Sequence, residues 1–341
     1  MDEAIPSPSG GTRRNFIYHC GTGLGGIALA ALTGPGSLRG AEKAGGRGPV
    51  RLGVTGGDAI WRAAGPRLRG ATIGPFSRDP AAFDAVIFVE PGRLEPGLVG
   101  LCLSEKRPVL IVADAWLTSD ILKTLSATAQ QSGTPLAVAN PDRFLPSRQM
   151  IRQHLDEGKL GEPGLVRMHR WEPMPADPRP GFDALPVSLL RDLDLALSLV
   201  GQSPDSIYAI ERRADESRPA SGRSVQVHLG FPGGGMAMID HANRLPPGDD
   251  YVSLSLIASN GAAYADDHRN MQLVYRGGHP QSVRVEEHGR LFTSIAQDFV
   301  DGLIAKRDFA PGRKAWDSAL AVAGQVQLSL TTGQAINPEA G

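Results

Sequence analysis

The chain of 341 residues has few cysteines, no excess of charge of one sign and no long apolar run. Two cysteines are too few for a disulfide framework. Lys and Arg number 35 against 36 Asp and Glu, a net charge of −1, so the basic excess typical of nucleic-acid binding is missing. No apolar stretch reaches the roughly 20 residues that a transmembrane helix needs. From these absences we expect no disulfide-stapled scaffold, no nucleic-acid partner and no membrane-spanning segment.

Motifs of metal and nucleophile chemistry are missing as well. The sequence has no C-x-x-C, no H-x-x-x-H and no G-x-S-x-G string. We therefore expect neither a metal site nor the nucleophile elbow of a serine hydrolase. What the chain has in abundance is glycine, 42 residues, and proline, 27 residues, which predict many turns.

The N-terminus carries a short motif of its own. Arg13 and Arg14 precede the glycine-diluted apolar stretch 21–32, an arrangement typical of a twin-arginine export signal. We assign residues 1–41 to this signal and residues 42–49 to a linker. Cys20 precedes the apolar stretch, which does not favour a lipoprotein anchor. The prediction is a periplasmic or otherwise extracytoplasmic protein that is not in the membrane in its mature form.

Residues 50–140 are expected to form a Rossmann-like α/β domain. Buried strands without alternation are predicted at 50–54, 84–90, 108–113 and 135–138, with helices at 97–105 and 117–131 between them. Strands that alternate with helices of this size indicate a parallel, doubly wound sheet. Residues 78–84 are too few for the usual third strand–helix unit, so the domain is expected to be pruned.

Residues 141–337 change in character and predict an α+β domain. We expect helices at 146–159, 186–200, 291–306 and 314–330, and strands at 164–171, 224–231, 235–240, 251–258 and 271–275. Short alternating strands joined by Gly, Pro and Asn turns indicate an antiparallel sheet. The fold class predicted is thus α/β plus α+β, with C-terminal helices.

Three strings resemble one family. Residues 140–167, 192–201 and 298–336 are similar to segments of the glucose-fructose oxidoreductase/inositol dehydrogenase (Gfo/Idh/MocA) family. The resemblance implies NAD or NADP in the first domain and oxidation or reduction of sugars and polyols at the interface with the second. It also implies association, as a homo- or hetero-oligomer, through the open sheet face, which places the oligomer surface on strands within 224–275.

The nucleotide turn departs from the family pattern. The cofactor-binding candidates are Gly53, Gly56 and Gly57, at the end of the first predicted strand. With G-x-G-x-x-G laid on Gly56, Asp58 and Trp61 stand at the second and third glycine positions. A carboxylate repels the pyrophosphate, and an indole obstructs close helix–strand packing. NAD or NADP is therefore implied by the resemblance but opposed by these residues.

The catalytic positions of the family are replaced too. The resemblance places its lysine at Ala113 and its aspartate and histidine at Val187 and Arg191. None of these side chains can accept a proton near neutral pH. The polar residues that remain candidates for the cleft are Asp114, Arg191, Asp192 and His241, with Asn140, Arg143, Asp194 and His169 as further members. Arg191 could hold an anionic or polyhydroxylated ligand, or could form an ion pair with Asp114.

Three hypotheses for the function follow. The leading one is a family scaffold without the usual dehydrogenase chemistry, which binds a carbohydrate or serves as a partner protein. The first alternative is an active NAD(P)-dependent sugar or polyol oxidoreductase with relocated catalytic residues. The second is a nucleotide-assisted glycoside hydrolase. Both alternatives require a bound nucleotide.

Overall fold

A computed structural model describes residues 48–55, 62, 64–89, 96–113, 117–173, 185–213, 222–246, 249–267 and 287–338. The chain divides into Met1–Gly48 and Pro49–Gly341, and the description below concerns the second unit. Several features that the sequence singled out lie outside the described residues: the export signal 1–41, most of the linker 42–49, Gly56, Gly57, Asp58, Trp61, Asp114 and the expected strand 271–275.

The first layer is a parallel sheet, as predicted for residues 50–140. Every described pair in it is parallel, and the strand order is β2-β1-β3-β4-β5. The strands are β1 (Val50–Thr55), β2 (Ala71–Pro75), β3 (Ala85–Phe88), β4 (Val109–Val112) and β5 (Leu136–Ala139). Three of these match predicted strands closely and β3 lies inside one, but the sequence did not indicate β2, whose short run contains Gly74 and Pro75.

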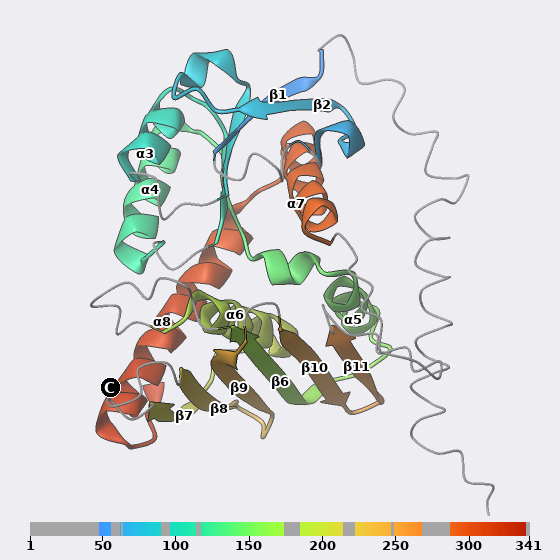
Figure 1. Cartoon of the computed structure of the whole chain (residues 1–341), viewed down its shortest axis with the longest axis vertical. Helices are drawn as coiled ribbons and strands as arrows, with labels where there is room; N and C mark the ends of the chain where they lie inside the picture. Colours follow the sequence, from blue (N-terminus) through green and yellow to red (C-terminus); the bar gives the residue numbers. More distant parts are fainter. Residues whose placement is uncertain are drawn as a thin grey trace, which may run out of the picture. The chain divides into compact units, whose positions relative to one another are not determined.

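Both faces of the parallel sheet are covered by helices (Figure 1). On one face Val86, Ile111 and Val138 pack in a core shared with α3 (Pro96–Ser104) and α4 (Ser119–Ser132). On the other face the alternate residues of the same strands pack against α7 (Glu287–Ile304), whose Phe292, Ile295 and Phe299 are buried. The C-terminal part of the chain thus returns to complete the first core, although the sequence division assigned it to residues 141–337.

The first domain is indeed short of a helix. Residues 76–84, between β2 and β3, contain the 3-10 turn Pro80–Ala82 in place of a helix. Asp79 starts this turn, since its carboxylate accepts a hydrogen bond from the backbone N–H of Ala81 at 3.0 Å. The prediction of a pruned domain is confirmed at this crossover.

The second layer is a sheet with the order β11-β10-β6-β9-β8-β7. Its strands are β6 (Pro163–Pro173), β7 (Ser206–Arg213), β8 (Arg223–Gly230), β9 (Met236–Leu245), β10 (Tyr251–Ala258) and β11 (Gly261–Asp267). The expectation of a purely antiparallel sheet is corrected, because β6 and β9 run parallel. The reason is the connection: α6 carries the chain from β6 to the far edge, and the meander β7-β8-β9 returns beside β6.

Among the described residues, helices pack on one face of this mixed sheet and none packs on the other. The inward face carries Val166, Met168 and Arg170 of β6, and it lies against α6 (Val187–Val200) and α8 (Ala310–Thr332) (Figure 1). Helix α6 ends at Gly201, whose φ of 77° suits a glycine C-cap, and α5 (Pro146–Asp156) lies near β11. No helix among the described residues has the length and apolarity that a membrane crossing requires.

Candidate functional site

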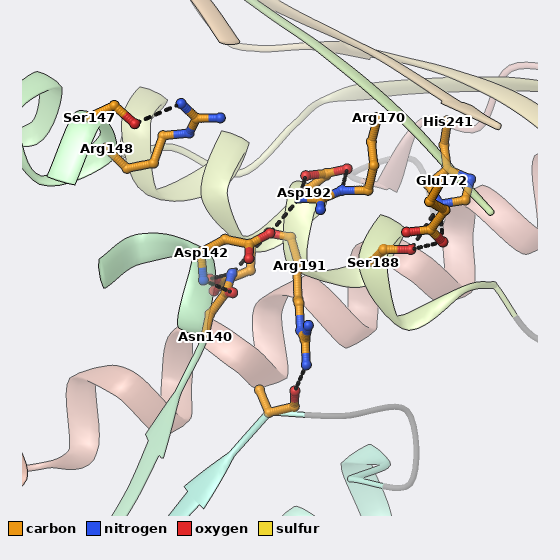
Figure 2. A network of polar contacts seen from close by, with 12 residues as sticks. Asn140, Asp142, Ser147, Arg148, Arg170, Glu172, Ser188, Arg191, Asp192 and His241 are labelled. Carbon is orange, nitrogen blue, oxygen red and sulfur yellow. Dashed lines mark hydrogen bonds and ion pairs between the residues drawn. The ribbon is translucent and has the colours of Figure 1, made fainter. Parts of the chain in front are cut away.

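The carboxyl edge of the parallel sheet is tied to helix α6. Asn140, which follows β5, accepts a hydrogen bond from Asp142 N at 3.0 Å and so begins the 3-10 turn Pro141–Phe144. Its amide donates to the backbone oxygen of Arg191 at 2.9 Å and to Asp194 Oδ2 at 2.7 Å. Figure 2 shows this contact between the end of β5 and the helix. The two layers therefore meet at Asn140 through side-chain hydrogen bonds.

Two carboxylates of α6 are held by arginines in forked geometry. Arg143 donates to both oxygens of Asp194, from Nε at 2.6 Å and from Nη2 at 2.7 Å. Arg170 donates to both oxygens of Asp192, at 2.8 and 2.7 Å, and also contacts Asp142. Such bidentate pairs fix geometry and neutralise the carboxylate. Burial alone would lower the pKa of Arg170, but Asp192 and Asp142 raise it well above its usual value.

The structure corrects the assignment of Asp192 to an open cleft. Its side chain is 0% exposed and its oxygens are occupied by Arg170. A carboxylate that is buried and paired in this way joins α6 to β6, and both of its oxygens are already occupied by Arg170. Asp194 is similarly buried, with 2% exposure, so both acids of the helix serve as structural anchors.

The positions that correspond to the family's lysine and histidine lie next to each other. Arg191 Nη2 donates to the backbone oxygen of Ala113, directly after β4, at 3.0 Å (Figure 2). Arg191 Nε is buried and has no hydrogen-bond partner within the described residues. Val187 is the first residue of α6, one helical turn before Arg191. Asp114, the expected ion-pair partner of Arg191, lies outside the described residues.

A second polar group lies at the start of α6 and includes His241, one of the predicted candidates. The hydroxyl of Ser188 donates to Glu172 Oε1 at 2.7 Å, and His241 Nε2 lies 2.8 Å from the same hydroxyl and 3.3 Å from Glu172 Oε1. His241 Nε2 thus lies within hydrogen-bond distance of both the hydroxyl of Ser188 and the carboxylate of Glu172.

Glu172 is the exposed member of this group, with 29% of its side chain accessible. Burial acts to raise the pKa of Glu172, but the hydrogen bonds from His241 and Ser188 and the charges of His241 and Arg170 together hold it below its usual value. The group thus presents an ionised carboxylate beside α6. Sequence reasoning missed Glu172 and Ser188. The signal lay in the inward positions of β6, where Arg170 and Glu172 interrupt the apolar series begun by Val166 and Met168.

His169 does not belong to this site. It lies on the opposite face of β6, where its Nδ1 is 3.3 Å from Asp240 Oδ2, and the indole N–H of Trp171 donates to the same oxygen at 3.3 Å. A strand alternates its side chains between faces, so His169 and Arg170 cannot point into one cleft. The alternation of His169 with Met168 and Arg170 favours a strand-face histidine over a ligand-binding one, and its position confirms the strand-face interpretation.

The nucleotide end of the parallel sheet is described in part. The strand order reverses between β1 and β3, and ligands of doubly wound sheets bind outside the carboxyl ends at such a point, here beyond Thr55 and Phe88. Gly53, a predicted cofactor residue, lies within β1, where an added Cβ would be 2.9 Å from the ring of Phe83. Packing against an aromatic ring accounts for this glycine. The topology fits a dinucleotide, and the described residues hold no phosphate-binding turn of their own.

Two cavities adjoin the arginine clamps. One of about 470 Å³ lies between α5, α6 and α8 and is lined by Arg143, Arg148 and Arg152. The other, of about 300 Å³, lies between β5, α7 and the start of α8, and Asn140 and Asp194 reach it. Among the described residues no group of three or more His, Cys, Asp and Glu side chains could hold a metal ion.

In this geometry a parallel sheet of the nucleotide-binding type meets a mixed sheet across one polar helix. Residues 148–264 match the family model described as GFO/IDH/MocA C-terminal domain. The "Uncharacterized oxidoreductase YrbE" of Bacillus subtilis (strain 168) is 22% identical over 198 residues, which cover 54% of this chain and 56% of that protein. The alignment thus spans about half the length of that relative.

Solved structures agree with the fold. The myo-inositol 2-dehydrogenase from Lactobacillus plantarum superposes with a TM-score of 0.69 at 17% identity, covering 85% of this chain and 99% of that one. The scyllo-inositol dehydrogenase from Lactobacillus casei with bound NAD(H) and scyllo-inositol superposes with a TM-score of 0.68 at 15% sequence identity. This superposition covers 84% of this chain and 98% of that one. Residues 148–264 are thus similar to the C-terminal domain of this family, and the described chain shares the fold of these dehydrogenases.

Proposed function

We propose that this protein is a ligand-binding member of the Gfo/Idh/MocA family that has lost nicotinamide-dependent hydride transfer. The contact between Arg191 and Ala113 carries the proposal. Oxidation of a hydroxyl needs a group that accepts its proton. Arginine stays protonated and alanine does not titrate, while Asp192 and Asp194 are buried against arginines. A carbohydrate is the ligand class that the family relation favours.

The family relation allows NAD or NADP on this scaffold, and that cofactor would supply the hydride acceptor when bound. In this chain the place for it is beyond Thr55 and Phe88, at the reversal of the strand order. Asp58 and Trp61 follow directly in the sequence, and we propose that their charge and bulk weaken binding of the pyrophosphate. At Ala113, where the resemblance places a lysine, the chain offers a methyl group and a backbone oxygen.

A second candidate function is an active sugar or polyol oxidoreductase with a relocated base. Glu172, ionised and partly exposed at the start of α6, favours it. The lowered pKa of Glu172 argues against it, because a carboxylate that holds its proton weakly is a poor general base. A nucleotide-assisted glycoside hydrolase would need the same nucleotide, and no observation in the described residues favours it over oxidation.

An assay at stoichiometric enzyme concentration separates these functions. The protein is mixed with NAD⁺ or NADP⁺ and with myo-inositol, scyllo-inositol, glucose or gluconate, and reduced nucleotide is followed by absorbance. An authentic scyllo-inositol dehydrogenase serves as the positive control. We expect no reduced nucleotide above the level without sugar. A single turnover with any of these compounds would contradict the proposal and favour the relocated base.

We propose export through the twin-arginine route as part of this function. The arginine pair at Arg13 and Arg14 supports it. Fractionation of a bacterial host that has this route should find the processed protein outside the cytoplasm. The double substitution Arg13→Lys and Arg14→Lys should leave the precursor inside. Equal export of the two forms would refute the assignment.

We also propose that the protein associates with a second copy of itself through the outward face of the mixed sheet. Exposed apolar side chains gather on neighbouring strands of this face: Trp171, Tyr208, Ile210, Met236, Ile257 and Tyr264. Met236 and Ile257 are neighbours across Leu165, whereas polar residues such as Arg167 and His169 separate them from Trp171. Exposed apolar side chains on an open sheet face are typical of an interface. Sedimentation should show a dimer or larger species that Ile257→Asp shifts toward monomer. A wild-type monomer at micromolar concentration would contradict the proposal.

A further inference from the structure

We propose that the ligand is a polyhydroxylated carboxylic acid, a sugar acid, whose carboxylate binds Arg191 and whose hydroxyls donate hydrogen bonds to Glu172. This inference rests on the proposed function, since it names the ligand class of the same site. It goes further in requiring one negative charge and several hydroxyl groups on the ligand. Neutral sugars and carboxylic acids without hydroxyl groups each lack one of these two features.

Arg191 differs from the other arginines of the site in what it binds. Arg143 and Arg170 each hold a carboxylate with two parallel hydrogen bonds. Arg191 makes its described hydrogen bond to a backbone oxygen, and its Nε is buried without an acceptor in the described part of the chain. A guanidinium has five donors in a planar fork that matches a carboxylate. A carboxylate on Arg191 would supply the acceptor that Nε lacks.

Glu172 forms the second half of the proposed binding site, opposite in charge to Arg191. Ser188 and His241 both direct donors at its Oε1, which keeps the carboxylate ionised and fixed in place. An ionised carboxylate only accepts hydrogen bonds, so it selects donors such as the hydroxyls of a sugar. Its negative charge also opposes a dianionic ligand such as a phosphate ester, which leaves a monoanion with hydroxyl groups as the better fit.

Helix α6 sets the spacing between the two halves. Ser188, which holds Glu172, and Arg191 are three residues apart, and side chains at this interval lie roughly 5–6 Å apart at Cβ on neighbouring parts of the helix surface. Figure 2 shows Ser188 reaching toward Glu172, while the Arg191 side chain leaves the helix in another direction, and its Nη2 donates to Ala113. A sugar acid has the matching distribution, with a carboxylate at one end and hydroxyls along its length.

The test is isothermal titration of the full mature protein with four probes: gluconate, galacturonate, galactose and hexanoate. We expect gluconate or galacturonate to bind at least tenfold more tightly than galactose and hexanoate. Arg191→Gln and Glu172→Gln should each weaken this binding at least tenfold. Arg191→Lys, which keeps the charge but loses the fork, should lie between wild type and Arg191→Gln. Arg167→Gln, on the exposed outward face of β6, is the matched control and should bind as wild type does.

Each outcome has a distinct meaning once thermal unfolding has shown that the variants are folded. Equal binding of galactose and galacturonate, or wild-type affinity in Arg191→Gln, would overturn the inference while leaving a sugar-binding function intact. Absence of binding by all four probes would overturn the inference too. Tight binding of a sugar acid together with reduction of NAD⁺ would support the ligand class and refute the proposed loss of hydride transfer.

Discussion

The guanidinium of Arg191 donates a hydrogen bond to the backbone oxygen of Ala113 at 3.0 Å, which joins helix α6 to the end of strand β4. These two residues stand where the family resemblance places a histidine and a lysine. The two elements therefore meet at the positions that the resemblance singles out, and the groups present there are a guanidinium and a methyl-bearing residue that contributes its backbone oxygen.

We expect the fold to lose stability when the ion pair between Arg143 and Asp194 is removed. Asp194→Asn should lower the free energy of unfolding by about 2–4 kcal/mol, because Asp194 is buried while Arg143 remains partly solvated. Asp156→Asn is the matched control, since Asp156 pairs with Arg152 on an exposed helix surface and should cost at most about 0.5 kcal/mol. Urea unfolding of both variants measures the difference. Equal costs would show that the clamp on α6 does not stabilise the fold.

Glu172 predicts a pH-dependent contribution to stability. Its folded pKa lies below the ordinary value of 4.5, so the stabilisation is present above about pH 4.5 and is lost as the pH falls through the lowered folded pKa. Glu172→Gln should therefore be less stable than wild type at pH 6 to 8, and the gap should close in acid. Unfolding curves across this range test the prediction. A gap that is constant with pH would mean that the ionised form is not the one stabilised.

We expect an alanine at Gly53 to clash with its surroundings, whereas an alanine at Gly74, its partner in β2, should not. Gly53→Ala should destabilise by about 1–3 kcal/mol, because the new methyl would meet the rings of Phe83 and Phe76 at 2.9 and 3.0 Å. Gly74, its partner in β2, has no atom within 4 Å of an added Cβ. Gly74→Ala should accordingly be neutral or stabilise by up to about 1 kcal/mol. A reversed order of the two variants would refute the packing role of Gly53.

We expect the thiol of Cys102 to be unreactive in the native state. Its side chain is 0% exposed, and burial raises the pKa of the thiol to about 11. The thiolate is the reactive form of cysteine. Alkylation of Cys102 at pH 8 should therefore be about 100-fold slower or more in the folded protein than in urea. Peptide mass spectrometry after timed labelling gives the rate. Rapid labelling without denaturant would show that α3 opens readily from the sheet.

The sequence was sufficient for the parallel sheet and most helices, because their apolar runs and caps are local features. Gly201 ends α6 where its glycine predicts, and Pro146 begins α5. β2 could not be predicted, since its five residues include a glycine and a proline and owe their conformation to pairing with β1. The packing of α7 on the first sheet is a contact between distant segments, which periodicity does not specify.

The sequence indicated which residues lie near the site, but it did not indicate which of them contact one another. The resemblance singled out Ala113 and Arg191 separately, and their hydrogen bond appears only in the structure. The same reasoning left Asp192 as an open acid, because nothing in the string indicates that Arg170 approaches from β6. Glu172 and Ser188 were missed for the same reason, since their hydrogen bond joins a strand end to a helix start across a segment outside the described residues. Hydrogen-bond partners between elements depend on the tertiary arrangement.

Nucleotide content tests the central claim most directly. The precursor is expressed in a host with the twin-arginine route, and the mature protein is purified without added cofactor and denatured. Mass spectrometry then measures released NAD(H) and NADP(H), and thermal unfolding is repeated with each cofactor added. The account predicts no stoichiometric nucleotide and no thermal shift. One nucleotide per chain would contradict it and would direct attention to Glu172 as the relocated base of an active oxidoreductase.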